Sequence, residues 1–240
     1  MRFAIFGDIH ANLEALEAVL ADAKEQSCTH HVCLGDVVGY NANPHECCQR
    51  VRALDCPIVK GNHDEQAAMV ESLDSFNPLA EAALAWTRNQ LTADDKAWLL
   101  EMRLVRQVRD FTIVHATLDT PHKWGYVFNQ LDAAASFSYQ RTSVCFFGHT
   151  HAPRAYIREG AVISMAFERL KFEMGKKYFI NCGSVGQPRD GDWRAAYVIY
   201  DATRNFIELR RVEYDIRTAQ EKIIEAGLPL RLADRLALGK

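Results

Sequence analysis

The chain has 240 residues, of which 48% are apolar and 25% charged, a composition typical of a globular protein. Lys and Arg total 28 against 31 Asp and Glu, giving a formal net charge of -3. No overall positive field would therefore recruit nucleic acid or anionic lipid, which disfavours a dedicated nucleic-acid-binding protein. Seven scattered cysteines without a C-x-x-C pair predict free thiols in a reducing compartment. No segment has the pattern of a signal peptide or membrane span, so we expect a cytoplasmic protein.

The first 60 residues alternate apolar runs of strand length with segments of helical spacing. In chain order they are RFAIF (2–6), a helix over 12–24, HVCL (31–34), a helix over 43–54 and CPIV (56–59). In the second helix, Asn43 is the expected N-cap, Pro44 the first helical residue and Glu46 the partner in a capping box. This alternation predicts parallel β-α-β units.

The rest of the chain is first helical and then rich in strands. Residues 65–102 predict a helical insertion, with helix starts at Asn77-Pro78 and at Thr92. The segments that follow are a hairpin over 103–115 turning at Arg109-Asp110, a helix over 130–140, a strand over 143–147, several strands beyond 153, and terminal helices over 215–238 split by Gly227. No repeat or linker interrupts the chain, so we predict one α/β domain over residues 1–240.

Metal-capable side chains follow five of the apolar runs, at the point where each predicted strand ends. They are Asp8 and His10, Asp36, Asn62 with His63 and Asp64, His115, and His149 with His151. The carboxyl ends of neighbouring strands share one edge of an open sheet, the usual place for a binding crevice. Glycine precedes the polar group in four of the five cases, which permits a sharp turn and a close backbone approach. Each residue alone would more often be a turn, cap or core residue, but together they predict a shared metal site.

The order of these motifs, D-x-H, G-D, G-N-H-D, a single H and G-H-x-H, resembles the calcineurin-like metallophosphoesterases. The stretch GSVGQPRDGD (183–192) also resembles a segment of the small prokaryotic members. The fold that this resemblance implies is a four-layer α/β/β/α sandwich of two mixed β-sheets flanked by helices. It also implies two metal sites that share one carboxylate. The residues of one site are then Asp8, His10, Asp36 and His151, and those of the other are Asp36, Asn62, His115 and His149.

Two adjacent cations can lower the pKa of bound water to about 7 and hold the oxygens of a phosphate. The resemblance therefore implies a dinuclear phosphoesterase that hydrolyses phosphomonoesters or small phosphodiesters by attack of a metal-bridging hydroxide. His63 would face the leaving group, with Asp64 either orienting its imidazole or capping the next helix. Ligands without thiolates suit Mn, Fe, Ni, Co or Zn, and manganese is favoured.

Several alternatives remain at this stage. Within the enzymes they are hydrolysis of dinucleoside polyphosphates such as diadenosine tetraphosphate, and phosphoprotein phosphatase activity. An alternative of another class is a non-catalytic metal-binding scaffold. The expected partner is a small phosphorylated substrate, and the oligomeric state is open. Three polar residues near the motifs could contact phosphate: Asn12, Asn41 and Arg189. Three aromatic residues could stack on a nucleobase or phenyl leaving group: Trp124, Tyr126 and Trp193.

Overall fold

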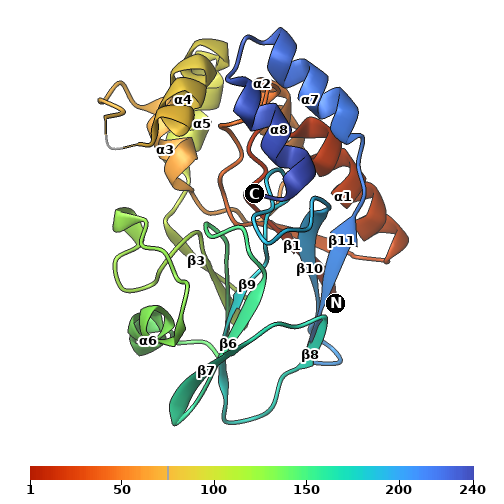
Figure 1. Cartoon of the computed structure of the whole chain (residues 1–240). Coiled ribbons are helices and arrows are strands. Elements are labelled where there is room, and N and C mark those ends of the chain that lie inside the picture. The colour runs from red at the N-terminus through yellow and green to blue at the C-terminus, as the bar shows by residue number, and fades with distance from the viewer. Residues whose placement is uncertain (75) are drawn as a thin grey trace.

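Two mixed β-sheets face each other at the centre of the protein (Figure 1). The computed structural model describes residues 1–74 and 76–240. The strands of the first sheet, in spatial order, are β2 (His30–Cys33), β1 (Arg2–Phe6), β10 (Ala195–Asp201), β11 (Phe206–Val212) and β8 (Arg169–Lys171). Those of the second are β3 (Val105–Val108), β4 (Phe111–Val114), β5 (Val144–Phe147), β9 (Lys177–Asn181), β6 (Arg154–Glu159) and β7 (Ala161–Met165).

Both sheets combine parallel and antiparallel pairs. β1 pairs in parallel with β2 and antiparallel with β10, while β4, β5 and β9 run parallel to one another. The parallel strands therefore end at the same edge of each sheet, and the polar motifs follow directly after β1, β2, β4 and β5. This arrangement brings together side chains that are more than a hundred residues apart in the chain.

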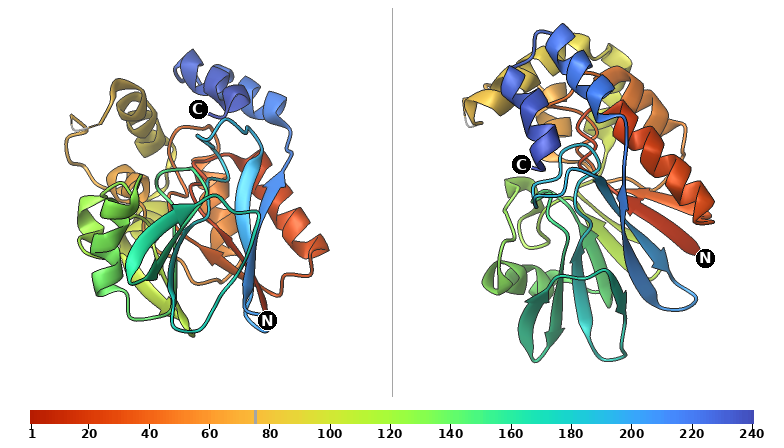
Figure 2. Two further views of the ribbon diagram at one scale, coloured as in Figure 1. Left: turned by 60° about the horizontal axis from the view of Figure 1, so that its bottom comes forward. Right: turned by 45° about the vertical axis from the view of Figure 1, so that its right-hand side comes forward.

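Helices cover the outer faces of the two sheets, which gives four layers (Figure 2). Seven helices share one apolar cluster with the outer face of the first sheet: α1 (Leu13–Glu25), α2 (Pro44–Arg52), α3 (Asn62–Ala68), α4 (Pro78–Gln90), α5 (Ala93–Glu101), α7 (Ile216–Glu225) and α8 (Leu230–Leu238). Helix α6 (Gln130–Tyr139) packs on the outer face of the second sheet through Ala133 and Phe137. The predicted four-layer fold is confirmed.

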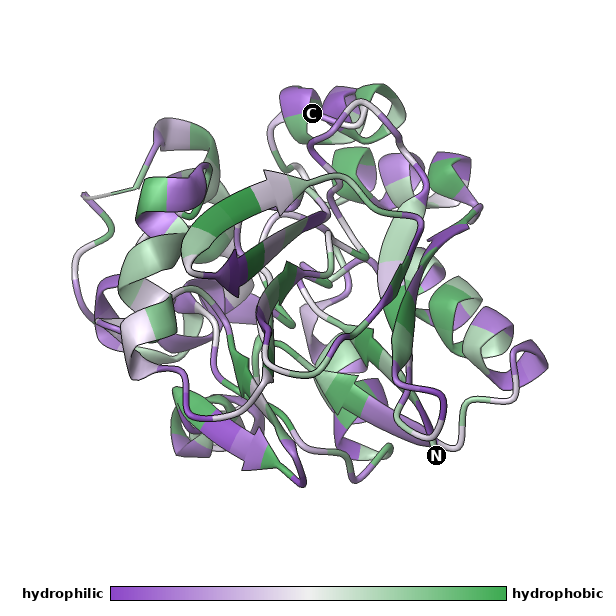
Figure 3. Cartoon of the chain, turned by 90° about the horizontal axis from the view of Figure 1, so that it is seen from below, coloured by the Kyte–Doolittle hydropathy of each residue, from purple (hydrophilic) through white to green (hydrophobic). Residues whose placement is uncertain are grey.

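Side-chain alternation along the strands explains why both faces of a sheet are covered. Phe3 and Ile5 of β1 point into the core between the sheets, whereas Ala4 and Phe6 point toward the helices. Figure 3 shows hydrophobic and hydrophilic residues alternating along the peripheral helices, while many of the strands are largely hydrophobic. Within the described residues, no helix is both long and apolar enough to cross a membrane.

Most of the predicted elements are present, and two local expectations are wrong. Residues 56–59 form only isolated bridges, Cys33 with Ile58 and Val59 with Arg103, instead of a strand. Asn43 does precede α2, but its side chain makes no capping hydrogen bond, so the capping box with Glu46 is absent. The short strand β8 was not predicted. The hairpin turns as expected at Arg109, which has a φ of 55°.

Candidate metal centre

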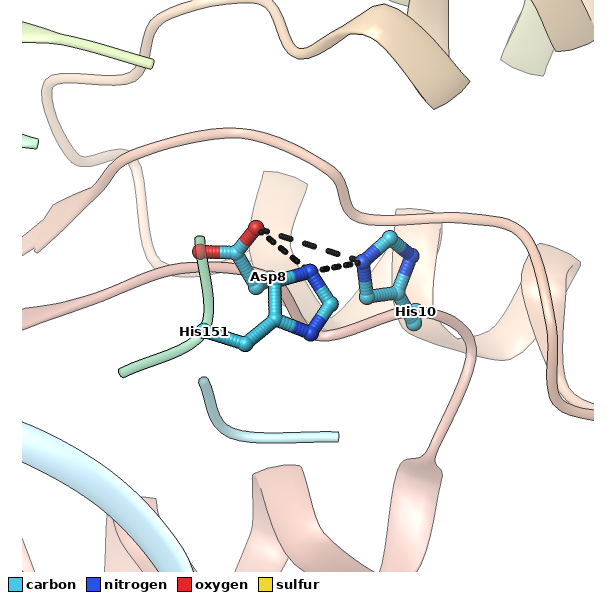
Figure 4. A group of neighbouring side chains, drawn as sticks. All are labelled: Asp8, His10 and His151. Carbon is cyan, nitrogen blue, oxygen red and sulfur yellow. Dashed lines mark hydrogen bonds and ion pairs between the residues drawn. The ribbon is translucent and has the colours of Figure 1, made fainter. Parts of the chain in front are cut away.

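The seven predicted ligands meet at the carboxyl ends of the parallel strands. Asp8 and His10 follow β1, and Asp36 follows β2, while the remaining positions come from β4, β5 and the start of α3. None of the seven is more than 7% exposed. Figure 4 shows three of them, Asp8, His10 and His151, pointing toward one another. His151 Nε2 is 3.1 Å from His10 Nε2 and 3.2 Å from Asp8 Oδ1.

Asp36 links this group to a second one formed by His115 and His149. The Oδ2 atom of Asp36 is 3.6 Å from His10 Nε2 and 3.3 Å from His115 Nε2. On the far side, His115 Nε2 is 3.2 Å from His149 Nδ1. One carboxylate oxygen therefore reaches both groups, which is the position expected for a bridging ligand.

The hydrogen bonds on the outer nitrogens of the four histidines show that their inner nitrogens fit a cation. Each outer nitrogen contacts a backbone carbonyl: His10 with Val38 at 3.1 Å, His115 with Leu34 at 2.8 Å, His149 with Trp124 at 2.9 Å and His151 with Gln187 at 2.6 Å. A carbonyl only accepts hydrogen bonds, so the outer nitrogen carries the proton and the inner one carries a lone pair. In the neutral form, the inner nitrogens of His10 and His151 face each other with a lone pair on each, and so do those of His115 and His149. A cation bound by both nitrogens of a pair would remove the repulsion between the lone pairs.

Two further features agree with a bound cation. The Oδ1 atom of Asn62 is buried and has no hydrogen-bond partner among the described residues. Burial lowers the pKa of His149 to about 3. For His115 burial acts in the same direction, but the Asp36 and Asp8 carboxylates outweigh it and raise the pKa to about 10. The carboxylates therefore favour positive charge at the centre of the cluster.

The backbone around the cluster is strained in a way typical of functional sites. Five of the predicted ligands have a left-handed backbone with φ between 48° and 67°: Asp8, His10, Asp36, His149 and His151. Non-glycine residues adopt this region at a cost of about 1–3 kcal/mol each. The adjacent glycines are needed for close approach, because a Cβ on Gly61 would lie 2.0 Å from Asp36 Oδ1 and one on Gly148 would lie 2.2 Å from Asp8 Oδ2.

Comparison with known proteins decides which family this geometry represents. The family model for the calcineurin-like phosphoesterase superfamily domain matches residues 1–205. The chain belongs to this superfamily. It is 43% identical to a metallophosphoesterase from Sphaerobacter thermophilus, whose crystal structure superposes with a TM-score of 0.89 over 100% of this chain and 99% of that one.

Two other proteins are similar along their whole length. An uncharacterised protein of Methanocaldococcus jannaschii is 40% identical over 242 residues, covering 99% of this chain and 98% of the relative. A hypothetical protein from Pyrococcus horikoshii shares the fold, with a TM-score of 0.82 at 18% identity over 100% of this chain and 98% of that one. These findings support a phosphoesterase of a metal-dependent family, with a buried His and Asp cluster able to hold metal.

His63 of this phosphoesterase is buried beside the cluster, but Asp64 does not contact it. The Oδ2 atom of Asp64 accepts the backbone N–H groups of Asp36 and Gly61 at 2.8 and 3.0 Å, and Oδ1 accepts that of Val37 at 2.7 Å. Asp64 also completes a capping box at the start of α3. The predicted role of Asp64 in orienting His63 is therefore wrong, and the predicted capping role is confirmed. His63 Nδ1 is buried without a partner in the described chain.

The three predicted phosphate contacts have different surroundings. Asn12 is buried and caps α1, and its Nδ2 donates to Gly186 O at 3.1 Å, so its amide has a structural role and the phosphate contact stays a prediction. Asn41 is buried and its Nδ2 donates to His10 O at 2.7 Å. Of these three residues, only Arg189 is charged, and its charge acts on the site. Burial lowers the pKa of His10 and His151 most, and the Arg189 guanidinium is one of the further groups that lower it.

Two of the three predicted aromatic residues lie beside the candidate metal centre. Trp124 and Tyr126 line a cleft beside His149, whereas Trp193 packs on Tyr214 at 5.8 Å against the helical core, and its stacking role stays a prediction. Sequence reasoning missed Tyr40, whose ring lies 4.5 Å from that of His63. The sequence feature that could have identified Tyr40 is its position four residues after the metal-capable Asp36.

Proposed function

We propose that the protein is a dinuclear-metal phosphoesterase that hydrolyses phosphomonoesters or small phosphodiesters. The observation that carries the proposal is that the inner nitrogens of two histidine pairs, His10 with His151 and His115 with His149, face each other at 3.1 and 3.2 Å on either side of Asp36. One cation would be held by Asp8, His10, Asp36 and His151, and the other by Asp36, Asn62, His115 and His149. The donor set of imidazole, carboxylate and amide without thiolate suits Mn, Fe, Ni, Co or Zn, and we favour manganese.

The chain's own groups would bind the phosphate and assist the leaving group. Bound divalent cations would supply an activated water nucleophile and neutralise charge on the phosphate oxygens. Arg189 is held by Gln187 Oε1 at 2.8 Å and lies 5.6 Å from the Tyr40 ring, which keeps its guanidinium in a position to bind phosphate. His63, whose backbone N–H donates to Asp36 Oδ1 at 2.8 Å, would donate a hydrogen bond or proton to the departing oxygen.

The test is hydrolysis of bis(p-nitrophenyl) phosphate by metal-stripped protein, with and without added Mn²⁺. Activity should return with the metal and fall by about 100-fold or more in Asp36→Asn, because removing a bridging charge removes stabilisation of both cations. Asp95→Asn is the matched control, since Asp95 is equally buried at 1% exposed but lies in a helix cap outside the cluster. Full activity in Asp36→Asn would contradict the proposal, and inactivity of protein shown to hold two metal equivalents would favour the scaffold.

His63→Asn separates a catalytic role from a structural one. Turnover should fall strongly while the metal content, measured by mass spectrometry of the dialysed protein, stays near that of the wild type. Loss of metal from this variant would instead identify His63 as a ligand or a structural residue. A panel of dinucleoside polyphosphates and phosphopeptides, run in the same assay, would compare the two alternative substrate classes directly.

A further inference from the structure

An open cleft of about 370 Å³ lies beside the predicted metal ligands. It is lined by Asn62, His63 and His149, by Tyr40 ahead of α2, and by residues from two further segments of the chain. One segment lies around α3 and the start of α4, and the other is the connection between β4 and α6, which Figure 1 shows on the same side of the molecule. In the proposed function the departing oxygen lies next to His63, so this cleft is the space available to the leaving group.

Aromatic rings line both sides of the cleft. On the side of His63, the Tyr40 ring lies 4.5 Å and the Phe76 ring 5.7 Å from the imidazole. On the side of His149, the Tyr126 ring stacks on the imidazole at 4.2 Å with an interplanar angle of 22°. Flat rings on two sides of the cleft favour a flat ligand, because stacking needs matching planes.

The aromatic surface on the second side is unusually open to solvent. Tyr126 and Phe128 are 50% and 67% exposed and stack on each other at 5.3 Å. Trp124 has one ring neighbour within the described chain, His115, in edge-to-face contact at 5.9 Å. Exposed aromatic surface beside reacting groups is a mark of a ligand site, since covering it with a ligand removes apolar area from water.

Polar groups in the cleft match the edge of a nitrogen-containing ring. Gln66 Oε1 is buried and has no hydrogen-bond partner in the parts of the chain that the structure describes. Lys123 adds a positive charge to the lining. A buried acceptor without a donor is unfavourable, and a turn of the Gln66 side chain toward the cleft would let an N–H group on a bound ring satisfy it.

We propose that this cleft is the leaving-group subsite and that it selects phosphate esters whose leaving group carries a flat unsaturated ring, either an aryl group or a nucleobase. The inference rests on the proposed phosphoesterase function, which supplies the reaction but not the preference. Aryl groups and nucleobases share the chemistry that counts here, because each presents a π face to an aromatic side chain.

Two matched substrate pairs test the preference without changing the reacting oxygen. Benzyl phosphate and cyclohexylmethyl phosphate differ in ring planarity, and adenosine 5′-monophosphate and ribose 5-phosphate differ in the base. With Mn²⁺-loaded protein, the flat member of at least one pair should have a kcat/KM larger by roughly 5- to 150-fold, the range that one stacked ring supplies. A preference in the first pair identifies an aryl subsite and one in the second a nucleobase subsite. Equal kcat/KM within both pairs would overturn the proposal.

Trp124→Leu removes the indole but keeps the backbone carbonyl that contacts His149, so the ratio within the preferred pair should fall toward one. Tyr139→Leu is the matched control: Tyr139 is an aromatic residue of α6, 62% exposed and outside the cleft lining, and its loss should leave the ratio unchanged. A wild-type ratio in Trp124→Leu would count against the proposed subsite.

Binding of two non-hydrolysable phosphonates separates this inference from the proposed reaction. Benzylphosphonate should bind the metal-loaded protein at least about fivefold more tightly than cyclohexylmethylphosphonate in equilibrium dialysis, if the aryl ring is the preferred one. Tighter binding of benzylphosphonate without turnover of any ester would refute the reaction and support the subsite. Turnover of all four esters without any preference would refute the subsite alone.

Discussion

Replacing Asp64 with Asn should destabilise the protein and weaken its hold on metal, because the Asp64 carboxylate joins the turns that carry Asp36 and Asn62. Its Oδ2 accepts the N–H groups of Asp36 and Gly61, and its Oδ1 accepts that of Val37, at distances of 2.7–3.0 Å. An Asn side chain has the same shape but only one acceptor oxygen. Whichever way the amide is turned, its NH₂ group faces at least one buried N–H group, which loses its acceptor.

The size of the effect follows from these contacts. A buried donor left without a partner costs about 1–3 kcal/mol, and hydrogen bonds to a charged group are stronger than neutral ones. We therefore expect Asp64→Asn to lower the free energy of unfolding by about 2–4 kcal/mol. With an m value of about 2–3 kcal/mol/M, the urea midpoint falls by roughly 0.7–2 M.

The assay is urea unfolding of the metal-free protein followed by circular dichroism, together with the metal content of dialysed holoprotein. Asp95→Asn is the matched control, since Asp95 is also the third residue of a helix and accepts the Thr92 N–H at 3.0 Å and hydroxyl at 2.7 Å. It should lose stability but keep its metal. An unchanged midpoint in Asp64→Asn, with normal metal content and reduced turnover, would refute the reasoning and return Asp64 to a role beside His63.

Three further predictions concern steric fit, protonation and packing. Gly148→Ala should weaken Mn²⁺ binding by about tenfold or more in calorimetric titration, because its Cβ would lie 2.2 Å from Asp8 Oδ2; wild-type affinity would contradict the tight approach. Burial lowers the pKa of His63 to about 4 and of His149 to about 3, below the unfolded value of about 6.5. Below about pH 6.5 the unfolded chain then binds more protons than the folded one, so the urea concentration at the midpoint of unfolding of the metal-free protein should decrease as the pH is lowered from about 6.5 to about 4. The decrease should be smaller in His63→Asn, and a midpoint that does not change with pH would exclude this reasoning. The Tyr40 ring lies 4.5 Å from that of His63, so we expect it to position the imidazole. Tyr40→Phe, which keeps the ring, should have a kcat near that of the wild type, and Tyr40→Leu should lower kcat about tenfold at normal metal content. Equal kcat in both variants would show that the ring does not position the imidazole.

The candidate ligands could be predicted from the sequence because their signal is local. Asp8, Asp36 and His149 each follow an apolar run within a few residues, and a strand, its end and the next polar side chain are all visible in one short window. Strand order and register then bring the ends together by a general rule of sheet geometry. Local signals also failed where tertiary pairing decides the outcome: residues 56–59 are apolar enough for a strand, yet they meet neighbours only at single bridges.

The roles of Asp64 and Asn12 depended on contacts between segments that are distant in sequence. Asp64 accepts from the Asp36 turn 28 residues earlier, and Asn12 donates to Gly186 O 174 residues later. No spacing rule within either motif contains these partners. Both side chains were assigned to catalysis or binding by their place in a motif, and the structure assigns them to holding the turns together.

By itself, the sequence indicated the alternation of strands and helices and which side chains could hold metal, since periodicity and residue type are properties of short segments. The four-layer sandwich was expected from the resemblance to the metallophosphoesterases. Only the tertiary structure decided how those side chains are held and what surrounds them. The carbonyls that face the outer nitrogens of the four histidines belong to Leu34, Val38, Trp124 and Gln187. Every residue has a carbonyl, so no residue type could mark these four, and their orientation exists only once strands from both sheets are packed.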